Sequence, residues 1–276
     1  MKQSLMRYHG GKWRLAPWII RHFPAHRVYV EPFGGAASVL LRKDRSYAEV
    51  WNDLDGEVVN LFRVLRNPAQ ARELVRLVTL TPYARDEFVE SAITTDDPIE
   101  QARRTLVSAG MGYSTGTQLS YGTGFRGNVT RSYTTPALDW RNYPATLDAA
   151  IDRLRGVVIE NRQALDVIRQ YDGPGTLFYL DPPYVFGTRN KRNAGQTYRH
   201  EMADWEHVAL AEVLRSVQGM VVLSGYPSAL YDGLYGDWQS DTIASHADGA
   251  LDRTEKLWMN RQALVQPMLF DDEVQG

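Results

Sequence analysis

Apolar positions along this chain fall into two kinds of pattern. Short continuous apolar runs, typical of buried strands, alternate with longer segments whose apolar positions recur at three- and four-residue spacing, typical of helices. The predicted strands are residues 28–30, 50–51, 157–159, 176–180, 220–223 and 256–258, and the predicted helices include 37–41, 58–65, 164–168 and 204–217. Strands that alternate with helices in this way predict an α/β fold with a mostly parallel sheet flanked by helices.

The middle of the chain, residues 64–154, has a different texture. It opens with helical material rich in Arg, Glu and Leu, and from 110 to 143 it becomes rich in Gly, Ser, Thr and Tyr, which predicts loops and short irregular strands. A long irregular segment inside a compact domain is usually functional or mobile. We therefore predict a core domain of residues 1–63 and 155–276, with residues 64–154 inserted as a largely helical and loop domain.

Composition narrows the classes of function. The 276 residues are 43% hydrophobic and 23% charged, with no signal-peptide core and no apolar run of membrane-spanning length, so we expect a soluble intracellular protein. The absence of cysteine excludes disulfides, thiolate metal sites and a cysteine nucleophile of the kind that methylates carbon 5 of cytosine. A net charge of −2 gives no overall nucleic-acid footprint, so any such binding must use local basic surface.

The strongest chemical signal is Asp181-Pro182-Pro183-Tyr184, directly after the strand predicted at 176–180. Two consecutive prolines cannot continue a sheet, so the chain must leave it there as a rigid loop that carries a carboxylate. Open α/β sheets build their sites at the carboxyl ends of strands. A proline-rich surface turn is the alternative interpretation.

Two further segments carry glycines or acids at informative places. The run Glu31 to Ser38 contains Gly34-Gly35 between a predicted strand and helix, and Asp53 follows about twenty residues later, where nucleotide-binding folds hold ribose hydroxyls. Upstream, Arg7 to Lys12 contains a Gly pair flanked by an aromatic residue and a lysine. Taken singly, these segments also fit a plain strand–helix connection and a helix cap at Asp53 or Asp55.

Taken together and in this order, the motifs resemble those of the Dam-type adenine-N6 DNA methyltransferases of bacteria and phages, over about residues 5–65 and 155–260. The resemblance implies a Rossmann-like methyltransferase fold, S-adenosyl-L-methionine as cofactor and double-stranded DNA as substrate. It also implies that residues 64–154 recognise the target sequence. We further expect a cytoplasmic protein of a bacterium or a phage-infected host, without metal or membrane association, as a monomer or weak dimer.

The resemblance also assigns residues by position. Tyr8 and Lys12 would lie beside the cofactor, Phe33, Gly34 and Gly35 under its methionine part, Asp53 at its ribose hydroxyls, and Asp181 between the cofactor and the target base. Family members often carry an acid where this chain has Gln163, so the cofactor's adenine would be held here by an amide or by backbone groups.

The expected chemistry follows from the group that accepts the methyl, which is the exocyclic amino group of adenine. The Asp181 carboxylate and the Pro182 carbonyl would accept hydrogen bonds from the adenine amino group, and Tyr184, held by Pro183, would stack on the flipped-out base. The predicted DNA contacts are base recognition by Arg126 and Arg131 and phosphate binding by Arg189, Lys191, Arg192 and Arg199. A solvated charged face is the alternative for each of these basic residues.

The sequence also allows other functions. The acceptor could be cytosine N4 or an amide nitrogen in RNA or protein, and the chain could be a catalytically degenerate DNA-binding protein of the same fold. A nicotinamide-dependent dehydrogenase is disfavoured because no complete G-x-G-x-x-G occurs. We assign residues 223–226 and 255–260 mainly to the sheet core, and His200 and His207 to structural roles.

Overall fold

A computed structural model describes residues 1, 3–113, 124–129, 134–185, 200–246 and 252–264. Five of the six predicted DNA contacts, Arg131, Arg189, Lys191, Arg192 and Arg199, lie outside these residues. Within them, no helix has both the length and the apolar character needed to cross a membrane.

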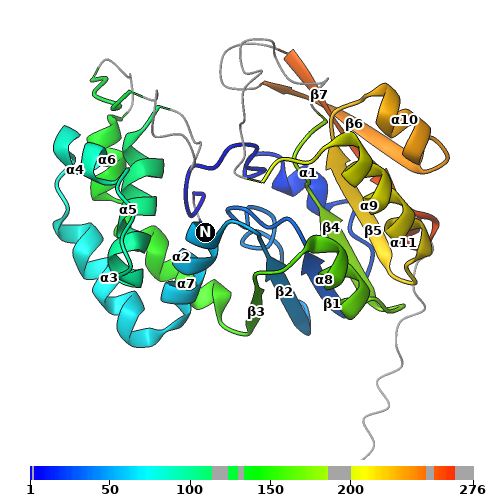
Figure 1. The fold of residues 1–276 in the computed structure, drawn as a ribbon, viewed down its shortest axis with the longest axis horizontal. Helices are drawn as coiled ribbons and strands as arrows, with labels where there is room; N and C mark the ends of the chain where they lie inside the picture. Colours follow the sequence, from blue (N-terminus) through cyan, green and yellow to red (C-terminus); the bar gives the residue numbers. More distant parts are fainter. Residues whose placement is uncertain (2, 114–123, 130–133, 186–199, 247–251, 265–276) are drawn as a thin grey trace, which may run out of the picture.

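The core of the fold is a seven-stranded sheet in the described part of the chain (Figure 1). Its order is β3 (Val157–Glu160), β2 (Ala48–Asn52), β1 (Val28–Glu31), β4 (Thr176–Leu180), β5 (Met220–Gly225), β7 (Asp252–Met259) and β6 (Gln239–His246). The first five strands are parallel, and β7 runs antiparallel to both of its neighbours. The prediction of a mostly parallel α/β sheet is confirmed.

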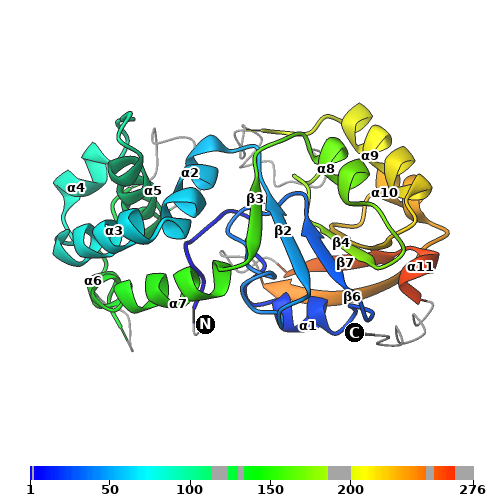
Figure 2. The ribbon, with the colours of Figure 1, turned by 90° about the horizontal axis from the view of Figure 1, so that it is seen from below.

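Helices cover both faces of this sheet (Figure 2). On one face lie α8 (Ala164–Tyr171), α9 (Asp204–Ser216) and α10 (Ala229–Tyr235), and on the other lies α1 (Ala16–Ile20). The short helix α11 (Arg261–Leu264) lies beside β5, and its Ala263 packs against the core on the α1 face. The alternation of β4 explains the two layers, because Phe178 packs toward α8 and α9 whereas Leu177 packs into the core on the opposite face.

A second group of helices stands beside the sheet, at the left of Figure 1. It contains α2 (Gly56–Arg66), α3 (Pro68–Leu80), α4 (Arg85–Glu90), α5 (Pro98–Met111), α6 (Pro136–Arg141) and α7 (Pro144–Leu154). Helix α2 packs against α3, α5 and α7, so this packing unit begins near residue 56. Arg153 of α7 pairs with the buried Glu49 of β2 at 2.6 Å, which fastens the helical group to the sheet.

The order of the strands changes direction between β1 and β4. From β1 the chain proceeds outward to β2 and β3 on one side, then crosses to β4 and β5 on the other. Loops after β1 and β4 therefore diverge, and open α/β sheets bind ligands in the resulting crevice at the carboxyl ends of the strands.

Two local predictions were wrong, and one strand was missed. Residues 37–41 form turns, not a helix, because Ala37 has a φ of 52° and the Leu40 amide donates to the Glu31 side chain at 2.8 Å. Strand β6 was not predicted, and α6 occupies part of the stretch expected to be loops and strands.

Candidate active site

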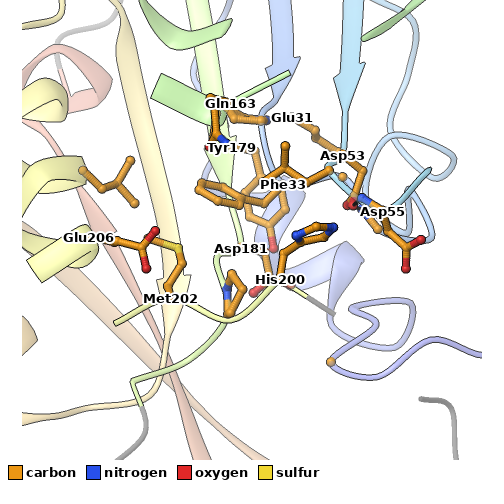
Figure 3. A pocket seen from close by; sticks show the side chains of 18 of the residues that line it. Glu31, Phe33, Asp53, Asp55, Gln163, Tyr179, Asp181, His200, Met202 and Glu206 are labelled. Carbon is orange, nitrogen blue, oxygen red and sulfur yellow. Dashed lines mark hydrogen bonds between the residues drawn. The ribbon is translucent and has the colours of Figure 1, made fainter. Parts of the chain in front are cut away.

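A cavity of about 490 Å³ opens at the carboxyl ends of β1, β2 and β4 (Figure 3). Its size falls within the usual range for small-molecule and cofactor sites. The lining residues come from 8–55, 163–183 and 200–210, and none comes from the described parts of 64–154, which are 64–113, 124–129 and 134–154. The cavity thus gathers the predicted Tyr8, Lys12, Phe33, Gly34, Gly35, Asp53 and Asp181 into one site.

Asp181 lies at the wall of this cavity, where the Pro182-Pro183 loop leaves β4. One carboxylate oxygen accepts a hydrogen bond from the buried Ser224 hydroxyl at 2.9 Å, and the other accepts one from Lys12 Nζ at 2.8 Å. Ser224 in turn lies 3.1 Å from the Tyr179 hydroxyl. Since a carboxylate offers about four acceptor positions, Asp181 retains capacity for a ligand.

Lys12 connects Asp181 to a buried network behind the cavity. The Lys12 ammonium also donates to the Tyr184 hydroxyl and to the Gly10 carbonyl, and it lies 3.4 Å from Glu255 Oε1. The Tyr184 hydroxyl donates to the same Glu255 oxygen at 2.6 Å. Burial raises the pKa of the Glu255 carboxyl, and the Lys12 ammonium opposes that rise.

The four residues of the Asp-Pro-Pro-Tyr loop occupy different environments. Asp181 and Pro183 line the cavity, whereas Pro182 and Tyr184 are buried and lie outside the lining. The Tyr184 ring has its centroid 4.8 Å from Lys12 Nζ and 4.2 Å from the ring of Tyr226. Its predicted stacking on a target base stays a prediction.

The two glycine segments meet at the floor of the cavity. A Cβ on Gly35 would come within 2.7 Å of the Tyr8 ring, and its φ of +46° is one that glycine adopts readily. A Cβ on Gly34 would lie 2.0 Å from the Trp51 indole, which stacks on Phe62. Glycine is therefore required at both positions by close packing.

Asp53 holds this glycine turn from the end of β2. Its two oxygens accept hydrogen bonds from the Gly35 and Asp55 amides, both at 2.8 Å. Burial raises the pKa of Asp53 to about 6, although both amide hydrogen bonds lower it. The helix cap is Asp55, which accepts from the Glu57 amide, so Asp53 stays directed into the cavity.

The fully buried Asn52 ties together the loops after three strands. Its side-chain amide donates to the Pro32 and Arg162 carbonyls, and its oxygen accepts from the Arg162 amide. Its own carbonyl accepts from Gly34. These bonds fix the loops after β1, β2 and β3 relative to one another, which pre-forms one end of the cavity.

The far end of the cavity is formed by α8 and by the start of α9. Gln163 faces the cavity from the beginning of α8 and Met202 from the segment before α9. Leu165 and Trp205 are also among the lining residues. The Gln163 side chain makes no cap hydrogen bond to α8. His200, predicted to be structural, also lines the cavity, whereas His207 is buried against Tyr231, as expected of a structural residue.

Arg126 is the one predicted DNA contact among the described residues. It is 9% exposed, and its guanidinium donates to the Gly110 carbonyl at the end of α5. Sequence reasoning missed Ser224 and Glu255, which it assigned to the sheet core. Across the described ranges, no group of three His, Asp or Glu side chains is placed to hold a metal ion.

The chain is similar in sequence to several known DNA adenine methylases. The chain is 25% identical to a DNA adenine methylase of Salmonella typhi over 83% of its own length and 82% of that protein. It is 29% identical to the DNA adenine methylase of Escherichia coli K12 over 41% of this chain and 42% of the relative, and 34% identical to that of Serratia marcescens over 23% of each. The latter two matches thus span less than half of those relatives. Residues 8–243 match the D12 class N6 adenine-specific DNA methyltransferases, and the chain belongs to this family.

Proposed function

We propose that this protein transfers a methyl group from S-adenosyl-L-methionine to N6 of an adenine flipped out of double-stranded DNA. The observation that carries the proposal is Asp181, a carboxylate on a rigid two-proline loop at the wall of a cofactor-sized cavity. Family membership supplies the reaction class, and the cavity supplies residues suited to it.

The cavity residues fit S-adenosylmethionine. Asp53 offers an anionic acceptor for ribose hydroxyls, and the glycine turn lets backbone approach the methionine part closely. Gln163 and Leu165 would hold the adenine end. When bound, this cofactor supplies a methyl group on a positively charged sulfur.

Asp181 acts on the acceptor nitrogen. The lone pair of the adenine amino group is delocalised into the ring, so the nitrogen is a poor nucleophile. Hydrogen bonds from that amino group to the Asp181 carboxylate and the Pro182 carbonyl would localise the lone pair and orient it for in-line attack. Extrusion of the base from the duplex costs about a few kcal/mol, which base stacking in the site recovers in part.

Residues 64–154 would choose the DNA sequence. The residues of this segment that the structure describes do not line the cavity, so their sequence can vary without disturbing the chemical site. Arg126 is held at the end of α5 by the Gly110 carbonyl, in the stretch where Arg131 also lies in the sequence. The basic residues 189–199 follow the catalytic loop, where phosphate contacts would position the duplex.

Transfer of labelled methyl groups tests the proposal. The purified protein is incubated with labelled S-adenosylmethionine and, separately, with unmethylated duplex DNA, total RNA and a protein extract. Label in DNA, abolished in Asp181→Ala, supports the assignment. Label confined to RNA or protein would refute it.

A further inference from the structure

The most informative unassigned group is Glu255, a carboxylate in β7 that is 2% exposed. It lies more than seventy positions after Asp181 in the sequence and reaches the site because β7 pairs antiparallel with β5. The next residue, Lys256, pairs with Gly225 of β5, and this places Glu255 behind the Asp-Pro-Pro-Tyr loop. There its carboxylate contacts the buried side chains of Lys12 and Tyr184.

Glu255 and Asp181 share one cation. Lys12 Nζ lies 2.8 Å from Asp181 and 3.4 Å from Glu255, and both the lysine and Glu255 are nearly inaccessible to water. A buried ammonium with Asp181 as its sole anionic neighbour would bind that carboxylate tightly, because charge pairs strengthen in a low dielectric. A second carboxylate near Lys12 weakens the attraction between the ammonium and Asp181.

Glu255 also anchors the catalytic loop. The Tyr184 hydroxyl donates to Glu255 and accepts from Lys12, so these three side chains form a closed triangle. Tyr184 is three residues from Asp181, and the two intervening prolines make the connection stiff. Because the Tyr184 hydroxyl is held at one end of this loop, the Asp181 carboxylate at the other end is held in position as well.

We propose that Glu255 is a positioning residue for methyl transfer, which shares Lys12 with Asp181 and holds Tyr184 by its hydroxyl. In this arrangement the Asp181 carboxylate is free to accept a hydrogen bond from the amino group of the target base. This inference rests on the proposed function. It concerns the chemical step and not cofactor binding, because Glu255 does not line the cavity.

The test compares Glu255→Gln with Asp232→Asn. Gln keeps the acceptor oxygen for Tyr184 but removes the negative charge. Asp232 of α10 is an exposed carboxylate that pairs with Lys256, the residue next to Glu255 on β7, and Asp232→Asn therefore serves as the control. Single-turnover rates are measured with labelled S-adenosylmethionine on PCR-amplified bacterial DNA, and cofactor Kd is measured by calorimetry. If the wild-type protein transfers no methyl group to DNA, both the proposed function and this inference are refuted.

With an active wild type, we expect Glu255→Gln to slow transfer about 10- to 100-fold, the size of one lost charge-assisted interaction, with cofactor Kd changed less than about twofold. Asp232→Asn should behave as wild type. A wild-type rate in Glu255→Gln, or a folded variant whose defect is in cofactor Kd alone, would overturn the inference.

Tyr184→Phe provides an independent arm. It removes only the hydroxyl that joins Lys12 to Glu255, and we expect transfer to slow about 3- to 10-fold with cofactor Kd unchanged. In the double variant, the two effects should be less than additive because the residues act through one network. If Glu255→Gln does not fold, an unchanged rate in Tyr184→Phe would overturn the inference by itself.

Discussion

Lys12 Nζ lies 2.8 Å from Asp181 Oδ2, although 169 positions separate the two residues in the sequence. This ion pair joins the first glycine segment of the chain to the Asp-Pro-Pro-Tyr loop after β4, which we propose to be catalytic. It explains why a lysine follows Gly10-Gly11: the turn delivers a cation to a carboxylate whose charge the proposed chemistry needs.

Replacement of Asp181 by Asn should stop catalysis while cofactor binding persists. The amide keeps the shape but offers one acceptor oxygen without charge, and it can no longer pair with Lys12. We expect the rate at saturating cofactor to fall by about 10²- to 10³-fold, as for other groups that stabilise a transition state electrostatically. Asp97→Asn, which retains a helix cap at α5, is the control and should remain fully active. Substantial activity in Asp181→Asn would place the essential acceptor elsewhere.

Replacement of Asp53 by Ala should weaken cofactor binding. The ribose would lose a charged acceptor worth about 1.5–3 kcal/mol. Asp172 is a matched control, because it also accepts two backbone amides, those of Gln218 and Gly219, but does not line the cavity. Calorimetry should show a raised Kd for Asp53→Ala alone. Equal Kd values in both variants would mean that Asp53 serves only the glycine turn.

Cofactor affinity should depend on pH through Asp53. Its pKa in the free protein is raised to about 6, and hydrogen bonds from ribose hydroxyls favour the ionised form, so the pKa falls on binding. Affinity should be constant above that pH and decline as the pH falls through it, by up to about tenfold per unit. Titrations from pH 8 to 5 should show this decline in wild type and not in Asp53→Asn. A decline of the same size in the variant would assign it to another group.

Gly34→Ala should destabilise the protein. The added Cβ would meet the Trp51 indole, a buried ring stacked on Phe62 that cannot move away freely. We expect a loss of about 1–3 kcal/mol in the free energy of unfolding, the usual cost of overpacking. Gly56→Ala, where a Cβ meets nothing within 4 Å, should be neutral or slightly stabilising. Chemical denaturation compares the two, and similar midpoints would contradict this packing argument.

Residues 64–154 should determine which DNA sequence is methylated. Arg131→Ala should shift or relax the methylated motif, whereas Arg192→Ala should weaken binding to all sequences and lower the salt slope by about 1. Methylation mapping and binding at several salt concentrations separate these outcomes. A chimera that carries this segment from a relative of different specificity but keeps the original motif would place recognition elsewhere.

Local chemistry explains how much of the site could be predicted. The strand before Asp181 is a continuous apolar run, and two prolines must end it, so the position of the carboxylate follows from a few adjacent residues. Asp53 was predictable for the same reason, because it directly follows β2. Parallel strands then bring such loops to one edge of the sheet.

Long-range pairing explains what could not be predicted. Glu255 enters the site only because β7 lies beside β5, and an antiparallel partner at that place leaves no mark in the local pattern. The missed turn at residues 37–41 has a similar cause. The Glu31 side chain takes the Leu40 amide, so tertiary contact overrides a helical apolar pattern.

Nucleoside analysis identifies the atom in DNA that receives the methyl group. Unmethylated duplex DNA is incubated with the protein and labelled S-adenosylmethionine, digested to nucleosides and separated by chromatography with mass detection. We expect label in N6-methyl-2′-deoxyadenosine, and none with Asp181→Ala. Label in N4-methylcytosine alone, or N6-methyladenine formed undiminished by Asp181→Ala, would contradict it.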